Sequence, residues 1–143
     1  MAKTTIRPVG EPTEGEAHVN SLSFDGVLTI QVMTRIRKGQ EWDVSHWEVV
    51  FTAPVGFRVL DERDTPEFWH DSVNVADPGY GAVAYEVLNG GWADLQAKAS
   101  PVMGSGFYPR LREYWIGGDA DCVNVLSEYE PVVSKIGASR VAA

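Results

Sequence analysis

Two neighbouring stretches of the chain alternate between apolar and polar residues with a period of two. In residues 27–37, one face collects the apolar side chains Leu28, Ile30, Val32 and Ile36. In residues 42–52, one face collects Trp47, Val49 and Phe51. This period is typical of half-buried β-strands rather than helices. Because Lys38-Gly39-Gln40 separates the stretches, they are predicted to form a long antiparallel hairpin with a three-residue loop.

Shorter stretches extend this pattern through the rest of the chain. Further strands are predicted at 57–61, 83–88, 111–116 and 122–126. Asn89-Gly90-Gly91 and Gly117-Gly118-Asp119 have the composition of hairpin turns. Thr65-Pro66-Glu67 is typical of a helix start, and residues 92–99 fit either a strand or a second short helix. The sequence therefore predicts an α+β, mainly antiparallel β fold: a curved sheet or partial barrel of six to seven strands with one or two short helices.

The ordered domain is predicted to cover residues 21–133. Residues 1–20 contain Pro8, Gly10, Pro12 and Gly15 without apolar periodicity, which predicts a loose N-terminal arm. Residues 134–143 are small and weakly patterned, which predicts a weakly ordered tail. The sequence contains one cysteine and no apolar run long enough for a signal peptide or a membrane span. We therefore expect a single cytoplasmic domain without a disulfide and without membrane association.

The negative charge of the chain is concentrated in its middle. The net charge is −8, and residues 41–100 contain eleven Asp/Glu against three Lys/Arg. Such an acidic region repels the phosphates of nucleic acids and attracts basic proteins. The only basic cluster, Arg35, Arg37 and Lys38, is too small to reverse this balance. The composition therefore argues against nucleic-acid binding and for a basic protein partner.

Tryptophan side chains within the acidic region suggest where such a partner binds. Trp is frequent at binding hot spots, and an acidic rim around a Trp anchor is a plausible protein-binding surface. The predicted partner-binding residues are Trp42, Asp43, Asp61, Glu62, Asp64, Glu67, Trp69 and Asp71. Taken singly, each Trp also fits a place in the core.

The sequence contains no convincing catalytic, metal or cofactor site. The carboxylates and His70 in residues 61–71 could bind a metal or act as acid and base, but a solvated corner between strand and helix explains them more simply. The histidines His18, His46 and His70 have no ligand-like spacing. Cys122 begins an apolar strand, which predicts a buried and inert thiol. We expect no catalytic residue, no metal and no cofactor.

Three short motifs carry a family resemblance. They are residues 57–64 (FRVLDERD) with Phe68-Trp69, then Gly90-Gly91-Trp92, then residues 113–116 (EYWI) followed by 122–127 (CVNVLS). In this order they resemble small, uncharacterised bacterial proteins, some of which look like immunity partners of secreted toxins. The resemblance covers roughly residues 47–127 and implies a bacterial, mainly antiparallel domain. It provides no catalytic residues.

Three functional hypotheses follow from these observations. The first is a non-enzymatic acidic protein-binding domain, such as an immunity protein that neutralises a basic toxin. The alternative is a small-molecule-binding domain, whose curved sheet encloses a pocket lined by the aromatic residues Trp47, Phe51, Tyr85 and Trp115. An enzyme that uses the 61–71 cluster is the weakest. A homo-oligomer that forms through an exposed strand edge is compatible with all three.

Overall fold

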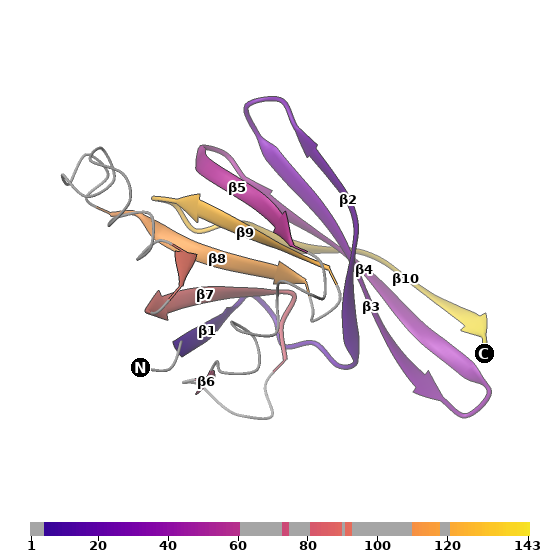
Figure 1. Cartoon of the computed structure of the whole chain (residues 1–143). Coiled ribbons are helices and arrows are strands. Elements are labelled where there is room, and N and C mark those ends of the chain that lie inside the picture. Colours follow the sequence, from indigo (N-terminus) through magenta and orange to yellow (C-terminus); the bar gives the residue numbers. More distant parts are fainter. Residues whose placement is uncertain (1–4, 61–72, 75–80, 90, 93–109, 118–120) are drawn as a thin grey trace.

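The computed structural model describes residues 5–60, 73–74, 81–89, 91–92, 110–117 and 121–143. Ten strands in these residues form two sheets that share a core (Figure 1). The six-stranded sheet has the order β5-β9-β8-β7-β1-β6, and the four-stranded sheet has the order β10-β4-β3-β2. The strands are β1 (Thr5–Val9), β2 (Glu16–Phe24), β3 (Leu28–Lys38), β4 (Glu41–Phe51), β5 (Pro54–Leu60), β6 (Val73–Asn74), β7 (Ala84–Asn89), β8 (Arg112–Gly117), β9 (Cys122–Ser127) and β10 (Val132–Ala142).

The long hairpin predicted from the period-two alternation is formed by β3 and β4. Lys38 lies opposite Glu41, so the turn has two residues rather than the predicted three. Gly39 adopts φ +66°, a conformation that glycine reaches without steric cost. The apolar faces of the two strands meet in the pairs Leu28 with Phe51, Ile30 with Val49 and Val32 with Trp47. All six of these side chains are buried.

The six-stranded sheet is antiparallel except where β1 runs parallel to β6. The predicted strands at 57–61, 83–88, 111–116 and 122–126 correspond to β5, β7, β8 and β9. Asn89-Gly90-Gly91 does not form the predicted tight hairpin turn, because β7 ends at Asn89 and the strand that follows it and pairs with it, β8, begins only at Arg112. The predominantly antiparallel character predicted from the sequence is confirmed.

Apolar side chains fill the space between the sheets. This core cluster combines residues of both sheets, among them Ile30, Phe51, Tyr114 and Val125. The ring of Phe51 meets the ring of Tyr114 edge to face, with centroids 5.4 Å apart. A second buried cluster contains Ile6, Ala82, Tyr85, Val87, Trp115 and Cys122. Since neighbouring residues of a strand point to opposite faces, this second cluster lies on the other face of the six-stranded sheet.

Three parts of the predicted fold class need correction. Strands are the only regular elements bounded within the described residues, so the α+β class is not supported there. The helix predicted from Thr65 lies outside the described residues, as do residues 93–99. The described strands number ten rather than six to seven, and their two sheets do not close into a barrel, because each sheet ends in edge strands. No helix within the described ranges has the length and apolarity needed to cross a membrane.

The two ends of the chain differ from their prediction as loose segments. The predicted arm contains β1 and the first part of β2, and Ile6 and Val9 of β1 are buried. Gly10 and Gly15, with φ near +85°, turn the chain between these strands, so the glycines mark a connection rather than an unstructured arm. The predicted tail forms most of β10, which pairs with β4 from Glu41 to Val50.

Candidate functional site

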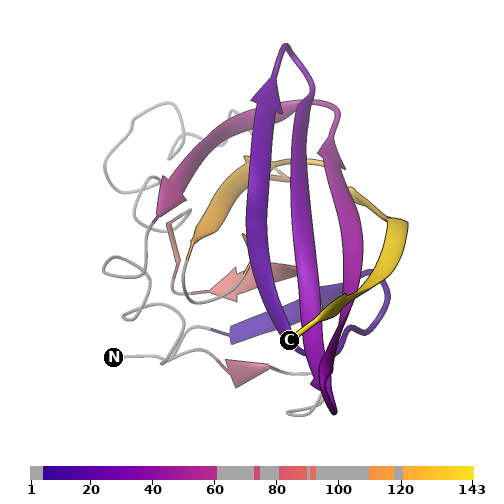
Figure 2. The same cartoon turned by 90° about the vertical axis from the view of Figure 1, so that its right-hand side faces the viewer.

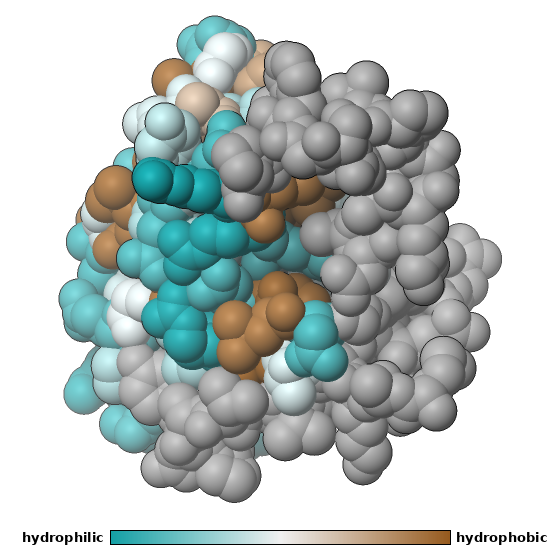
Figure 3. Space-filling model, turned by 90° about the vertical axis from the view of Figure 1, so that its left-hand side faces the viewer, coloured by the Kyte–Doolittle hydropathy of each residue, from teal (hydrophilic) through white to brown (hydrophobic). Residues whose placement is uncertain are grey.

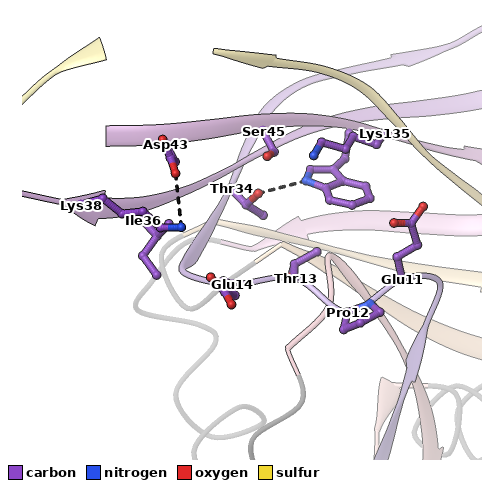
Figure 4. Close-up of a pocket in the computed structure, with 11 residues that line it drawn as sticks. Glu11, Pro12, Thr13, Glu14, Thr34, Ile36, Lys38, Asp43, Ser45 and Lys135 are labelled. Carbon is purple, nitrogen blue, oxygen red and sulfur yellow. Dashed lines mark hydrogen bonds and ion pairs between the residues drawn. The ribbon is translucent and has the colours of Figure 1, made fainter. Parts of the chain in front are cut away.

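The four-stranded sheet extends beyond the six-stranded sheet at one end. We call this end the wing; it consists of residues 34–45 of the β3–β4 hairpin and residues 138–142 of β10 (Figures 1 and 2). A cleft of about 250 Å³ opens at the base of the wing, where residues 10–15, the connection between β1 and β2, face the strands (Figure 4). Its lining consists of Glu11, Pro12, Thr13, Glu14, Thr34, Ile36, Lys38, Asp43, Ser45, Trp47 and Lys135.

Strand alternation brings the polar wall of the cleft together. Thr34 lies opposite Ser45, and Ile36 lies opposite Asp43, so these side chains continue the face that is apolar further along both strands. Trp47 stands where the apolar part ends. Its indole Nε1 donates a hydrogen bond of 3.0 Å to Oγ1 of Thr34, and both residues are buried. The base of the cleft is therefore preorganised by a satisfied hydrogen bond.

The charged groups of the cleft are unevenly paired. The carboxylate of Asp43 forms ion pairs with Nζ of Lys38 at 3.4 Å and with Nε of Arg140 at 2.9 Å. The ammonium of Lys135 lies 5.9 Å from the centroid of the Trp47 ring, within reach of a cation–π interaction. The carboxylates of Glu11 and Glu14 have no hydrogen bond or ion pair within the described part of the chain. They are thus the carboxylates of the cleft that are open to a ligand.

Only two of the eight predicted partner-binding residues lie in the described part of the chain. Asp43 lines the cleft, but it is already paired with two cations of the wing. Trp42 points to the opposite face of β4, where the guanidinium of Arg35 lies 4.9 Å from its ring centroid. The other six, Asp61, Glu62, Asp64, Glu67, Trp69 and Asp71, lie outside the described residues.

The four aromatic residues predicted to line a pocket do not lie together. Trp47 and Phe51 belong to the core between the sheets, whereas Tyr85 and Trp115 belong to the cluster on the other face of the six-stranded sheet. All four are at most 6% exposed. Trp47 alone of these four lines the cleft. Alternation along one strand shows which of its side chains share a face. It does not show which faces of different strands meet, so the sequence could not separate these two clusters.

A second polar cluster joins β7 and β8 through Glu86 and Arg112. On the face of the molecule shown in Figure 3, hydrophilic and hydrophobic residues lie side by side in the described part. Glu86 is 7% exposed, and its carboxylate contacts Arg7 and Arg112 at 2.6 Å each. Hydrogen bonds from Arg112 and then from Arg7 lower the pKa of Glu86 below its usual 4.5, against the opposing effect of burial. Glu130 contacts both arginines from the β9–β10 connection. The cluster links β1, β7, β8 and the β9–β10 connection. Its two arginines balance the charge of its two glutamates.

The remaining reactive groups are buried or dispersed. Cys122 is fully buried, as predicted, and burial raises the pKa of its thiol to about 12. Burial also raises the pKa of Tyr114 to about 12, so its hydroxyl stays neutral. Across the described ranges, no three His, Cys, Asp or Glu side chains gather as metal ligands. His70 lies outside those ranges.

Sequence reasoning missed Glu11 and Glu14 because they fall in the segment predicted as a loose arm. The signal that could have identified them is the pair Gly10 and Gly15, which bracket four residues with two carboxylates between them. Both glycines have positive φ, and a Cβ at Gly15 would lie 2.0 Å from the backbone oxygen of Arg35. The connection is therefore held tightly against β3.

Comparisons with protein-family models, with curated proteins and with solved structures found no match. The resemblance to immunity-like bacterial proteins thus depends on its short motifs alone.

Proposed function

We propose that this chain is a non-enzymatic binding protein for a basic protein partner, and that the cleft at the base of the wing takes one cationic side chain of that partner. The observation that carries the proposal is the presence of two free carboxylates, Glu11 and Glu14, at a cleft whose third carboxylate, Asp43, is already paired. A cationic group that enters the cleft would form charge-assisted hydrogen bonds with either carboxylate, and such bonds are stronger than neutral ones.

The size of the cleft favours a single side chain over a drug-sized ligand. Its volume of about 250 Å³ is below the roughly 300–1,000 Å³ typical of pockets for drug-sized ligands. The alternative function, a small-molecule site lined by four aromatic residues, has no support from the positions of those residues, because they lie in two separate clusters.

The charge of the lining is compatible with a cation. Three carboxylates stand against two ammonium groups, and one of these, Lys38, is bound to Asp43. The net charge of −8 adds long-range attraction for a basic protein. Such attraction increases the association rate and weakens as salt screens it.

The resemblance to immunity-like proteins suggests a basic toxin as the partner. An immunity protein must associate rapidly with its toxin, and complementary charge is one way to achieve this. The cleft does not define the class of toxin; identifying the protein that binds to this chain does.

Capture from a lysate of the source organism tests this function. The tagged chain is used as bait at low and at high salt, and bound proteins are identified by mass spectrometry. We expect one basic protein in stoichiometric amount, with less recovered as salt rises. Recovery of acidic or neutral proteins only, or capture that is indifferent to salt, contradicts the proposal.

A further inference from the structure

The free edge of β10 is the longest strand edge in the described structure. β10 (Val132–Ala142) is the terminal strand of the four-stranded sheet, and among the described strands only β4 pairs with it. Three of its large apolar side chains, Val132, Ile136 and Val141, are 61%, 51% and 48% exposed. An edge of this kind presents unpaired backbone N–H and C=O groups, which form a template for a further strand.

The edge is fixed in an extended conformation to its end. β10 stays in register with β4 as far as Ala142, and the backbone N of Ala143 donates to the carbonyl of Gln40 at 2.9 Å. A bulge between Lys135 and Gly137 interrupts the strand, but residues 137–142 are free of irregularity. This part belongs to the wing, which projects away from the six-stranded sheet (Figures 1 and 2). A second strand therefore meets a preorganised edge.

Charge makes this edge more suitable for a second copy of the same chain than the other edge of the same sheet. Two chains of net charge −8 repel each other, yet residues 131–143 contain no Asp or Glu. Of the two cations in β10, Arg140 is paired with Asp43 at 2.9 Å, and Lys135 lies over the ring of Trp47. By contrast, β2, the other edge strand of this sheet, begins with the exposed Glu16.

Symmetry then selects the register. In a two-fold antiparallel pair, one residue must lie opposite its own copy, because adjacent pairs alternate in hydrogen-bond type. If that residue were Arg140, two like charges would be opposed, which is unfavourable. If it were Ala138, Arg140 would meet the bulged position Ile136. Ser139 avoids both problems, and it places Val141 opposite Gly137, where there is room for its side chain.

We infer that two copies of this chain associate through β10, antiparallel and centred on Ser139, so that their four-stranded sheets join into one sheet of eight strands. The contact is isologous and closes on itself, so it produces a dimer rather than a fibre. It does not depend on the proposed basic partner, because it uses the backbone edge of β10 and not Glu11 or Glu14.

Opposite charges placed at Ser139 test this register. Sedimentation equilibrium of the 143-residue chain, up to millimolar concentration, is expected to show a reversible dimer. Ser139→Lys and Ser139→Glu each oppose like charges at the two-fold axis, and each should weaken self-association at least about tenfold. An equimolar mixture of the two variants should restore the dimer, which also shows that both variants fold.

Ser23→Lys is the matched control, because Ser23 is an exposed serine on β2, the other edge of the same sheet. It should dimerise like the wild type. The inference is overturned if the wild type is monomeric throughout, which would leave the edge to a strand of another protein. It is also overturned if Ser23→Lys disrupts the dimer, or if mixing the Ser139→Lys and Ser139→Glu variants does not restore it.

Discussion

Glu86 and Arg112 form a two-point ion pair between β7 and β8, with Nε to Oε2 at 2.6 Å and Nη2 to Oε1 at 3.0 Å. Arg7 of β1 contacts the same carboxylate at 2.6 Å. A carboxylate that is mostly removed from water is tolerable here because two guanidinium groups share it. This arrangement anchors β1, one of the strands that sequence patterning did not predict.

Replacement of Glu86 by Gln should destabilise the protein. The substitution removes the shared anion and leaves Arg7 and Arg112 close together, and these are partly exposed. We expect a loss of about 1–3 kcal/mol in the free energy of unfolding, measured by urea denaturation. Glu128→Gln is the control, because Glu128 has no described partner, and its stability should match that of the wild type. Equal stability of Glu86→Gln and wild type would show that the cluster contributes nothing net.

The same carboxylate makes stability depend on pH. Hydrogen bonds from Arg112 and Arg7 lower the pKa of Glu86 in the folded state below its usual 4.5. A group of this kind stabilises the fold above its unfolded-state pKa, and the contribution is lost as pH falls through the folded-state value. The difference in unfolding free energy between wild type and Glu86→Gln should therefore be constant near neutral pH and shrink below about pH 4.5. A difference that grows on acidification would contradict this assignment.

Because Trp47 and Thr34 share a hydrogen bond, substitutions at the two positions should have non-additive effects on the free energy of unfolding. Thr34→Val leaves the buried indole N–H without its acceptor, which should cost about 1–3 kcal/mol. Trp47→Phe removes the donor instead. In a double-mutant cycle by chemical denaturation, the Thr34→Val change should cost less when Trp47→Phe is already present than in the wild type. Strict additivity of the two changes would mean that this bond does not support the base of the cleft.

Gly15 and Gly26 both have positive φ, and comparing alanine substitutions at the two positions tests whether the 10–15 connection packs against β3. Gly26→Ala has no atom within 4 Å of the added Cβ, so its cost is that of backbone strain, about 1–2 kcal/mol. Gly15→Ala meets the same strain at φ +84°, and its Cβ would also lie 2.0 Å from the oxygen of Arg35. It should be clearly more destabilising than Gly26→Ala in thermal or urea unfolding. The reverse order would place the 10–15 connection away from β3.

The hairpin of β3 and β4 was predictable because the residues that define it, two alternating strands and the turn between them, are consecutive in the sequence. One face of each strand is buried against the core, and the alternation of residues such as Ile30 and Val49 records that burial directly. The hairpin of β8 and β9 was predictable for the same reason, with Gly117 opposite Cys122 across its turn.

The terminal strands were not predictable, since their partners lie far away in the sequence. β1 pairs with β7, and Pro8 within it is a residue that strand patterns usually exclude. β10 is an edge strand whose side chains are mostly exposed, so burial leaves little periodicity in its sequence. The candidate site shares this limitation. Glu11 and Glu14 become part of a cleft only when β1 and β2 are placed in different sheets.

The most direct test of the proposed function is the affinity of the captured basic protein for two charge-matched variants. Glu11→Lys/Glu14→Lys reverses the free carboxylates of the cleft. Asp25→Lys/Glu128→Lys makes the same change in net charge away from it, in the β2–β3 turn and after β9. By calorimetry or surface plasmon resonance, the cleft variant should bind at least about 100-fold more weakly, whereas the control should lose only the part due to long-range attraction. Equal losses in the two variants would contradict the account, because binding would then follow net charge and not the cleft.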